Sequence, residues 1–257
     1  MGDKSCLVFQ VAVGEVPSFY ATCVQSVKRY CDRHGFTHHL QTEPKLRIAP
    51  LKSCRSENAL RLGYLPIFEK EAAFDYLREY SSVAVVDADI YIRRDSPSIF
   101  DSTPCGESFG GVCERSMPLL PHYRDKIRKY SEGQYRGLTD VDWDWNEDGA
   151  AFYNCGVIVL GPGFKEHLNG QTPTEFLRRP EFERFINGEG HFKWSTDQTL
   201  LNWFVKKSGM TTQNLDWRFN ALYGAVRDIE QAYFVHFFLS SKMARGGAEI
   251  PEIIKRL

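Results

Sequence analysis

The sequence predicts an α/β protein built on a mainly parallel sheet that helices flank. Its predicted strands are apolar along their length, as in "VAVV" at residues 83–86, which indicates strands buried on both faces. They alternate with segments whose apolar residues recur at helical spacing, the order typical of an α/β layer. Of the 257 residues, 42% are hydrophobic, enough for a large core, and no long Pro-, Gly- or Ser-rich linker divides the chain. We therefore expect a single domain over residues 1–257.

The first predicted element is an apolar strand at residues 6–13, which a turn containing Gly14 and Pro17 follows. A second helix is expected over residues 57–80, with a new start near Pro66, because proline suits the first helical position. That helix leads directly into a strand at residues 83–92. The helix after the first strand is predicted from the helical spacing of Tyr20, Cys23, Val24, Val27 and Cys31.

The second half of the chain continues the alternation of strands and helices. Thr172 and Glu175 are spaced as a capping box, with a proline between them at the first helical position, so a helix begins there. Residues 114–150 show no clear periodicity and are expected to form an irregular insertion. The remaining predicted elements are strands at 108–113, 151–160 and 231–239 and helices at 195–207 and 249–257.

Composition excludes some classes of function. The formal net charge is -1 and the pI is about 6.7, so no strong basic field exists to bind nucleic acid or an acidic membrane. The seven cysteines form no CxxC pair or metal-finger spacing, and we expect most to be reduced core residues. The apolar run near the start is too short for a membrane span and does not fit a secretory signal. We expect a cytoplasmic protein, whose oligomeric state the sequence leaves open.

Two carboxylates, Asp87 and Asp89, stand at the end of the apolar run "VAVV". A carboxylate in an apolar setting is costly unless it is paired, hydrogen-bonded or bound to a metal. In an extended chain, residues two apart point to the same face, so both carboxylates could bind one cation while Ala88 turns away. Ligands bind beyond the carboxyl ends of parallel strands, and oxygen ligands suit Mg²⁺ or Mn²⁺. Taken alone, such a pair can also simply cap a turn.

Three further patterns follow the stretch "VVDADI" in order: "NCGVIVL" at 154–160, "TDQTLLN" at 196–202 and "HFFLSSK" at 236–242. With these four patterns the chain resembles the metal-dependent GT-A glycosyltransferases. It is most similar to the retaining family that includes glycogenin and bacterial lipooligosaccharide galactosyltransferases, glycosyltransferase family 8. The resemblance spans residues 6–242. It implies a GT-A (Rossmann-like) fold, with a mainly parallel mixed sheet flanked by helices.

The resemblance also implies a metal site for a nucleotide-sugar donor. Asp87, Asp89 and His236 would bind Mn²⁺ or Mg²⁺, and Lys242 would contact the donor diphosphate. Such groups suit the chemistry, because a departing diphosphate carries about two negative charges that a divalent ion and a lysine stabilise. A ligating histidine must be neutral, and its other ring nitrogen needs an orienting partner, which the sequence does not identify. Without the resemblance, His236 would be interpreted as a hydrogen-bonded core residue.

By the same resemblance, Asp197 and Gln198 are the candidate catalytic residues, with Asp197 bonded to donor-sugar hydroxyls and Gln198 near the anomeric carbon. Each of three candidates also has a plainer interpretation: Asp197 as an acid that stabilises a helix start, Gly156 as a packing residue only, and Lys70 as a solvated helix lysine. The further donor-binding residues that the resemblance implies are Lys70, Ala88, Asn154 and Gly156.

We expect retention of the anomeric configuration by front-face attack, since Gln198 is a poor nucleophile and a weak base. UDP is the favoured nucleotide and GDP the second, and the acceptor is a glycan, a protein or a lipid-linked sugar. Trp143 and Trp145, in the acidic stretch at 140–148, are expected in an exposed loop suited to acceptor stacking.

Two other functions remain open. One is a Mg²⁺-dependent phosphohydrolase with an aspartyl nucleophile, although Tyr91 stands where that class has threonine or valine. The other is a non-catalytic GT-A-like domain that binds carbohydrate or a partner protein. The sequence does not decide which sugar, hexose or pentose, is transferred.

Overall fold

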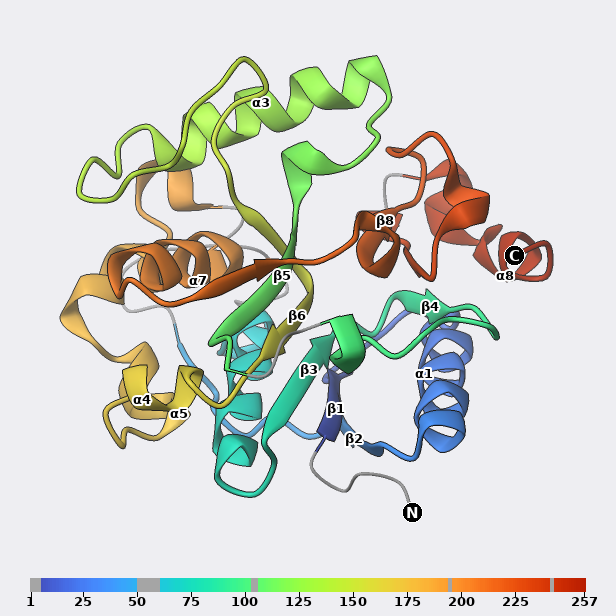
Figure 1. The fold of residues 1–257 in the computed structure, drawn as a ribbon, viewed down its shortest axis with the longest axis horizontal. Helices are drawn as coiled ribbons and strands as arrows, with labels where there is room; N and C mark the ends of the chain where they lie inside the picture. The colour runs from blue at the N-terminus through green and yellow to red at the C-terminus, as the bar shows by residue number, and fades with distance from the viewer. Residues whose placement is uncertain (1–5, 50–60, 103–105, 194–195, 241–242) are drawn as a thin grey trace.

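The computed structural model describes residues 6–49, 61–102, 106–193, 196–240 and 243–257, arranged in two sheets with helices around them (Figure 1). The larger sheet has the strand order β2-β1-β3-β6-β5-β7 and the smaller has the order β4-β9-β8. The strands are β1 (Cys6–Val11), β2 (Thr37–Gln41), β3 (Ser82–Val86), β4 (Ile90–Ile92), β5 (Phe109–Cys113), β6 (Tyr153–Leu160), β7 (Thr212–Asn214), β8 (Ala221–Leu222) and β9 (Phe234–His236).

The larger sheet is mixed and mainly parallel, which confirms the predicted fold class. Strand β1 pairs in parallel with β2 and β3, and β5 pairs in parallel with β7. Strand β6 is antiparallel to both of its neighbours, β3 and β5. Side chains of β1, β3 and β6 are buried on both faces, as their continuous apolar runs predict.

Helices cover both sheets and place the polar residues at the strand ends. Helix α1 packs against β4 and β2, α7 packs against β6, and the 3₁₀-helical segment η1 (Pro66–Arg78) packs against β1 and β3. The predicted capping box at Thr172 and Glu175 is present. The α-helices are α1 (Tyr20–His34), α3 (Pro121–Tyr135), α4 (Phe164–His167), α5 (Pro173–Leu177), α6 (Glu183–Asn187), α7 (Thr196–Lys207) and α8 (Ile250–Ile254).

The strand predicted at residues 83–92 is two strands in different sheets. After β3 the chain turns, with the Ile90 N–H donating to the Asp87 carbonyl at 3.2 Å, and β4 then pairs with β9. Asp87 and Asp89 therefore lie in a turn, so the expected extended geometry is wrong. The apolar pattern could not reveal the break, because residues 90–92 are as apolar as residues that continue a strand.

The prediction of an irregular insertion at residues 114–150 is also wrong, because α3 occupies its middle. The buried face of α3 includes the polar Ser131 and Gln134, so the segment lacks a clean apolar stripe. Trp143 is buried, with its indole N–H donating to the Leu138 carbonyl, and only Trp145 of the two tryptophans is exposed. The prediction that both tryptophans are exposed for stacking against an acceptor is therefore wrong for Trp143.

The described cysteines agree with the expected reduced state. Those at positions 6, 23, 31, 113 and 155 are buried thiols. Within the described ranges, no helix has the length and apolar character needed to cross a membrane.

Candidate active site

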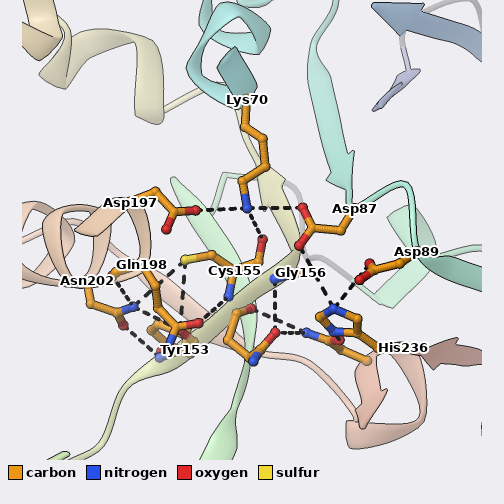
Figure 2. Close-up of polar contacts among 12 residues, drawn as sticks. Lys70, Asp87, Asp89, Tyr153, Cys155, Gly156, Asp197, Gln198, Asn202 and His236 are labelled. Atoms are coloured by element: carbon orange, nitrogen blue, oxygen red, sulfur yellow. Dashed lines mark hydrogen bonds and ion pairs between the residues drawn. The ribbon is translucent and has the colours of Figure 1, made fainter. Parts of the chain in front are cut away.

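Three predicted metal ligands from distant parts of the sequence converge at one place. Asp87 and Asp89 lie in the turn between β3 and β4, and the antiparallel register of β4 with β9 sets Ile90 opposite His236. One ligand atom of each of the three side chains lies within 4.8 Å of the others. Figure 2 shows the two carboxylates directed at the same ring nitrogen of His236, Nε2. The predicted convergence of two acids and a histidine is therefore confirmed.

A chain of hydrogen bonds orients His236. Its Nδ1 lies 2.9 Å from the side-chain oxygen of Asn220, whose NH₂ group donates to the side-chain oxygen of Asn154 at 2.8 Å. The NH₂ group of Asn154 donates in turn to the carboxylate of Glu114 at 2.8 Å. Because the Asn220 oxygen can only accept, Nδ1 must carry a hydrogen and donate it. Neutral His236 therefore directs the lone pair of Nε2 at Asp89 and Asp87.

Sequence reasoning did not find two members of this chain, Asn220 and Glu114. Asn220 belongs to none of the four recognised patterns, and Glu114 lies at the start of the supposed irregular insertion. The sequence signal for Asn220 was its position as a polar residue in the apolar segment "RFNALYG" at 218–224. That position alone does not indicate which residue it contacts. Burial raises the pKa of Glu114 to about 7, although the hydrogen bond from Asn154 opposes the rise.

The cluster fits a divalent cation. His236 Nε2 lies 3.4 Å from Oδ1 of Asp89 and 4.0 Å from Oδ2 of Asp87. That Asp89 oxygen is buried and accepts no hydrogen bond from the described residues. Neighbouring ligand atoms of one octahedral Mg²⁺ ion lie about 3 Å apart and opposite ones about 4 Å apart. Two carboxylates and a neutral imidazole thus match, in type and spacing, part of such a coordination shell.

The titration behaviour of the cluster reflects crowded negative charge. Burial raises the pKa of Asp87, while the ammonium group of Lys70 opposes that rise and Asp89 adds to it. Burial alone would lower the pKa of His236, but the carboxylates of Asp89 and Asp87 outweigh it and raise that pKa. Without a metal, the two carboxylates thus favour the protonated form of His236.

Lys70 links the acidic cluster to the start of helix α7. Its ammonium group lies 3.0 Å from Asp87 and 2.9 Å from Asp197, and it donates to the Cys155 carbonyl at 3.2 Å (Figure 2). Only 15% of the Lys70 side chain is exposed, so the interpretation as a solvated helix lysine is wrong. Burial would lower the Lys70 pKa, but Asp197 and Asp87 outweigh it and raise the pKa well above its ordinary value.

Hydrogen bonds hold both ends of the Gln198 amide. Its oxygen accepts from the Cys155 N–H at 3.1 Å, and its NH₂ group donates to the Tyr130 hydroxyl at 3.3 Å. One turn further along α7, Asn202 donates to the Tyr153 carbonyl and accepts from the Tyr153 N–H. These contacts attach α7 to β6 and direct Asp197 and Gln198 toward the cluster.

Gly156 is required by the close approach of β6 to the imidazole ring. A Cβ atom at this position would lie 2.5 Å from Nδ1 of His236, far inside contact distance. The Gly156 N–H donates to Asn154, and its carbonyl accepts from the Asp87 N–H at 2.8 Å. Gly156 therefore has a packing role: only a residue without a side chain leaves room here for the ring of His236, a predicted metal ligand.

A pocket of about 440 Å³ contains these residues. Among the predicted site residues it is lined by Lys70, Asp87, Ala88, Asp89, Asn154, Gly156, Asp197, Gln198 and His236. The prediction for Lys242 lies outside the described residues. None of residues 140–148 lines the pocket as the structure describes it.

No protein-family model and no curated protein matches the sequence. Solved structures match in fold. A glycosyltransferase involved in the glycosylation of the major capsid of PBCV-1 is 15% identical with a TM-score of 0.55, over 98% of this chain and 100% of that one. The galactosyltransferase LgtC, solved with donor and acceptor sugar analogues, is 15% identical with a TM-score of 0.52, over 98% and 96%.

A third similar structure is the bifunctional glycosyltransferase WbbM, at 13% identity and a TM-score of 0.56. The match covers 92% of this chain and 46% of WbbM. Together these similarities show that the protein has the fold of the GT-A glycosyltransferases. At such low identity they concern the fold alone, and membership of the retaining family stays a prediction.

Proposed function

We propose that the protein is a metal-dependent glycosyltransferase, which moves a sugar from a nucleotide-diphosphate sugar to a glycan, protein or lipid-linked acceptor. The observation that carries the proposal is one pocket holding both the Asp87, Asp89 and His236 cluster and the buried Lys70–Asp197 ion pair, in a GT-A fold. The galactosyltransferase structure with donor and acceptor analogues supports the same class of substrates.

Asp87, Asp89 and His236 would hold Mn²⁺ or Mg²⁺, which when bound neutralises the charge on the departing diphosphate. The protein's own residues orient that site: Asn220 keeps the Nε2 lone pair of His236 available, and Lys70 holds one oxygen of Asp87. Donor contacts of Lys70, Ala88, Asn154, Gly156 and Lys242 belong to the same proposal.

Asp197 and Gln198 are proposed to position the donor sugar. A carboxylate has about four lone-pair sites and Lys70 uses one at Asp197, which leaves capacity for sugar hydroxyls. Both ends of the Gln198 amide are already hydrogen-bonded, so this side chain is held in place and is a poor nucleophile. That restraint supports retention by front-face attack, in which the leaving phosphate accepts the proton of the acceptor.

The nucleotide is proposed to be UDP, with GDP as second choice, and the sugar is a hexose or a pentose. A panel of UDP- and GDP-sugars tests the proposal by thermal shift, each sugar being added with MnCl₂ and again with EDTA. We expect at least one sugar to raise the melting temperature only when Mn²⁺ is present. Slow release of the nucleoside diphosphate, measured by chromatography, should accompany that shift and stop with EDTA.

Two outcomes would contradict the proposal. Metal-independent binding of carbohydrate without any nucleotide-sugar turnover would favour the non-catalytic domain. Release of inorganic phosphate from a phosphomonoester such as p-nitrophenyl phosphate, with no effect of nucleotide sugars, would favour the phosphohydrolase.

A further inference from the structure

A second hollow surface lies where helix α1, strand β4 with the residues after it, and helix α8 meet (Figure 1). It consists of two adjoining hollows of about 670 and 400 Å³, both lined by Arg29, Arg93 and Arg94. Arg33 lines the smaller hollow and Lys255 the larger one. We call this surface, defined by these five residues, the arginine groove. Its lining shares no residue with that of the candidate active site.

The groove carries more positive than negative charge. The side chains of Arg29 and Arg94 make no hydrogen bond or ion pair with any residue that the structure describes. Arg93 and Arg33 donate to backbone carbonyls, those of Glu230 and Ser96, which orient the guanidinium groups without neutralising them. This concentration of charge is local, since the whole chain has a formal net charge of -1.

The acids of the groove offset only part of this charge. Asp95 and Glu230 line the larger hollow, and neither forms an ion pair with an arginine in the described part of the chain. Lys255 does have an acidic partner, Glu252, at 2.6 Å. Arginines that lack partners present planar forks of N–H donors, which match carboxylate and phosphate groups.

The rest of the lining suits a polar ligand with flat faces. Tyr91 and Tyr233 are half-buried in the wall, between serine, threonine and glutamine side chains. Arg218 lies over the ring of Tyr233 at 4.5 Å, so that ring is already covered on one face. Tyr91 has an apolar ring body and a polar tip, which suits a sugar ring with its hydroxyls.

Other polyanions fit this surface less well. A surface that inserts into a membrane carries exposed apolar side chains. The large apolar residues most exposed in the described chain line none of the groove; they are Val16, Ile67, Trp145 and Leu239. Nucleic acid binding requires an extended basic field, which a net charge of -1 does not provide. A short anionic ligand in a concave polar groove is the better match.

We propose that the arginine groove binds acidic carbohydrate, a glycan segment that carries carboxylate or phosphate groups. The arginines bind the anionic groups, and Tyr91 packs against a sugar ring. Naming carbohydrate as the ligand rests on the proposed glycosyltransferase function, for which such a glycan would be an acceptor or product. The anion-binding character rests only on the groove itself.

Isothermal titration at low ionic strength, without metal or nucleotide sugar, tests the proposal. The probes are a short oligogalacturonate, a phosphorylated maltooligosaccharide and the neutral maltooligosaccharide of equal length. We expect at least one acidic probe to bind and the neutral one not to bind. The double variant Arg29→Gln, Arg94→Gln should weaken that binding about tenfold or more, since each arginine loses charge-assisted hydrogen bonds.

The matched control removes two exposed cations elsewhere, in the double variant Lys165→Gln, Arg178→Gln, and should bind as the wild type does. All variants should keep the wild-type melting temperature, because no ion pair is lost. The proposal is overturned if neither acidic probe binds, if the neutral probe binds equally, or if the Arg29 and Arg94 variant binds unchanged. Tighter binding to phosphatidylglycerol vesicles than to the acidic glycans would also overturn it.

The two proposals fail separately. Asp89→Asn should leave probe binding by the groove unchanged while it weakens metal-dependent binding of nucleotide sugars about a hundredfold. If only the acidic probes fail to bind, the proposal for the arginine groove is wrong. If only metal-dependent donor binding is absent, the proposed function is wrong.

Discussion

Asp89 and His236 present lone pairs to each other across 3.4 Å, an arrangement that is repulsive unless a proton or a cation lies between them. Asn220 enforces it, because its side-chain oxygen keeps the imidazole hydrogen on the other ring nitrogen. At the scale of single residues, the site is therefore built to hold positive charge.

Replacing Asp89 by asparagine removes one charged ligand and keeps the shape of the side chain. We expect Mn²⁺ affinity to fall about a hundredfold and glycosyl transfer to fall by orders of magnitude, with an unchanged melting temperature. Isothermal titration with MnCl₂ measures the first effect, and release of nucleoside diphosphate measures the second. The exposed Asp75, replaced in the same way, is the control. Wild-type metal affinity in the Asp89 variant would remove this residue from the site.

Glu114 makes the metal-free protein sensitive to pH. Its pKa is raised from 4.5 to about 7, so the folded protein holds a proton that the unfolded chain has released over this interval. Stability should therefore be full below about pH 4.5 and fall as pH rises to about 7, by about 3 kcal/mol at most. Glu114→Gln keeps the acceptor oxygen for Asn154 and should remove that slope.

Chemical denaturation of the wild type and the glutamine variant at about pH 5 and about pH 8 measures this difference. At the higher pH the glutamine variant should be more stable than the wild type, and at the lower pH the two proteins should have similar stability. Equal slopes for the two proteins would show that Glu114 titrates normally in the folded state.

At the scale of elements, the site depends on how closely β6 approaches β9. Gly156 of β6 lies against the ring of His236, and a methyl group there would force the ring to move. We expect Gly156→Ala to cost about 1–3 kcal/mol of folding free energy and to weaken Mn²⁺ binding about tenfold or more.

Gly133 provides the control for this substitution. It lies in helix α3, and a Cβ atom there meets nothing within 4 Å. Gly133→Ala should leave metal binding unchanged and stabilise the protein slightly, as alanine does in helices. If Gly156→Ala bound Mn²⁺ as tightly as the wild type, the ring would have room that the structure does not show.

The turn between β3 and β4 shows a limit of prediction at this scale. Periodicity identified the apolar residues on both sides of Asp87 and Asp89, and it placed the pair at a strand end. It did not show that the chain changes sheets there, because β4 is determined by its pairing with β9, about 145 residues later in the sequence. Long-range pairing of this kind leaves no local signal.

At the scale of the whole molecule, metal binding and folding should be linked. A ligand present at a hundred times its Kd stabilises the folded state by about 2.7 kcal/mol, so MnCl₂ should raise the melting temperature and EDTA should reverse the rise. The shift should be smaller for Asp89→Asn.

This metal-induced shift should grow with pH. Without metal, the raised pKa of His236 means that its stabilising protonated form is present at low pH and lost as pH rises through the folded-state pKa. Metal binding requires the neutral ring of His236, so the affinity for the metal rises as the ring loses its proton with increasing pH. Melting curves with and without MnCl₂ across this range measure the trend, and a shift that is constant or falls with pH would contradict the role of His236.

One apolar cluster extends across both sheets and the helices around them. It includes residues as distant in sequence as Leu7 and Ile254. This agrees with the predicted single domain over residues 1–257, which stays a prediction.

By itself, the sequence determined the α/β class and most of the strands and helices, because burial and periodicity are local properties of the chain. Asp87 and Asp89 stood out at a strand end, whereas His236, Asp197 and Lys70 became candidates through the family resemblance. Only the tertiary structure decided that Lys70 joins Asp87 to Asp197 and that Asn220 and Glu114 orient His236. Such contacts join residues separated by 16 to 127 positions, and only the packing of the strands brings them together.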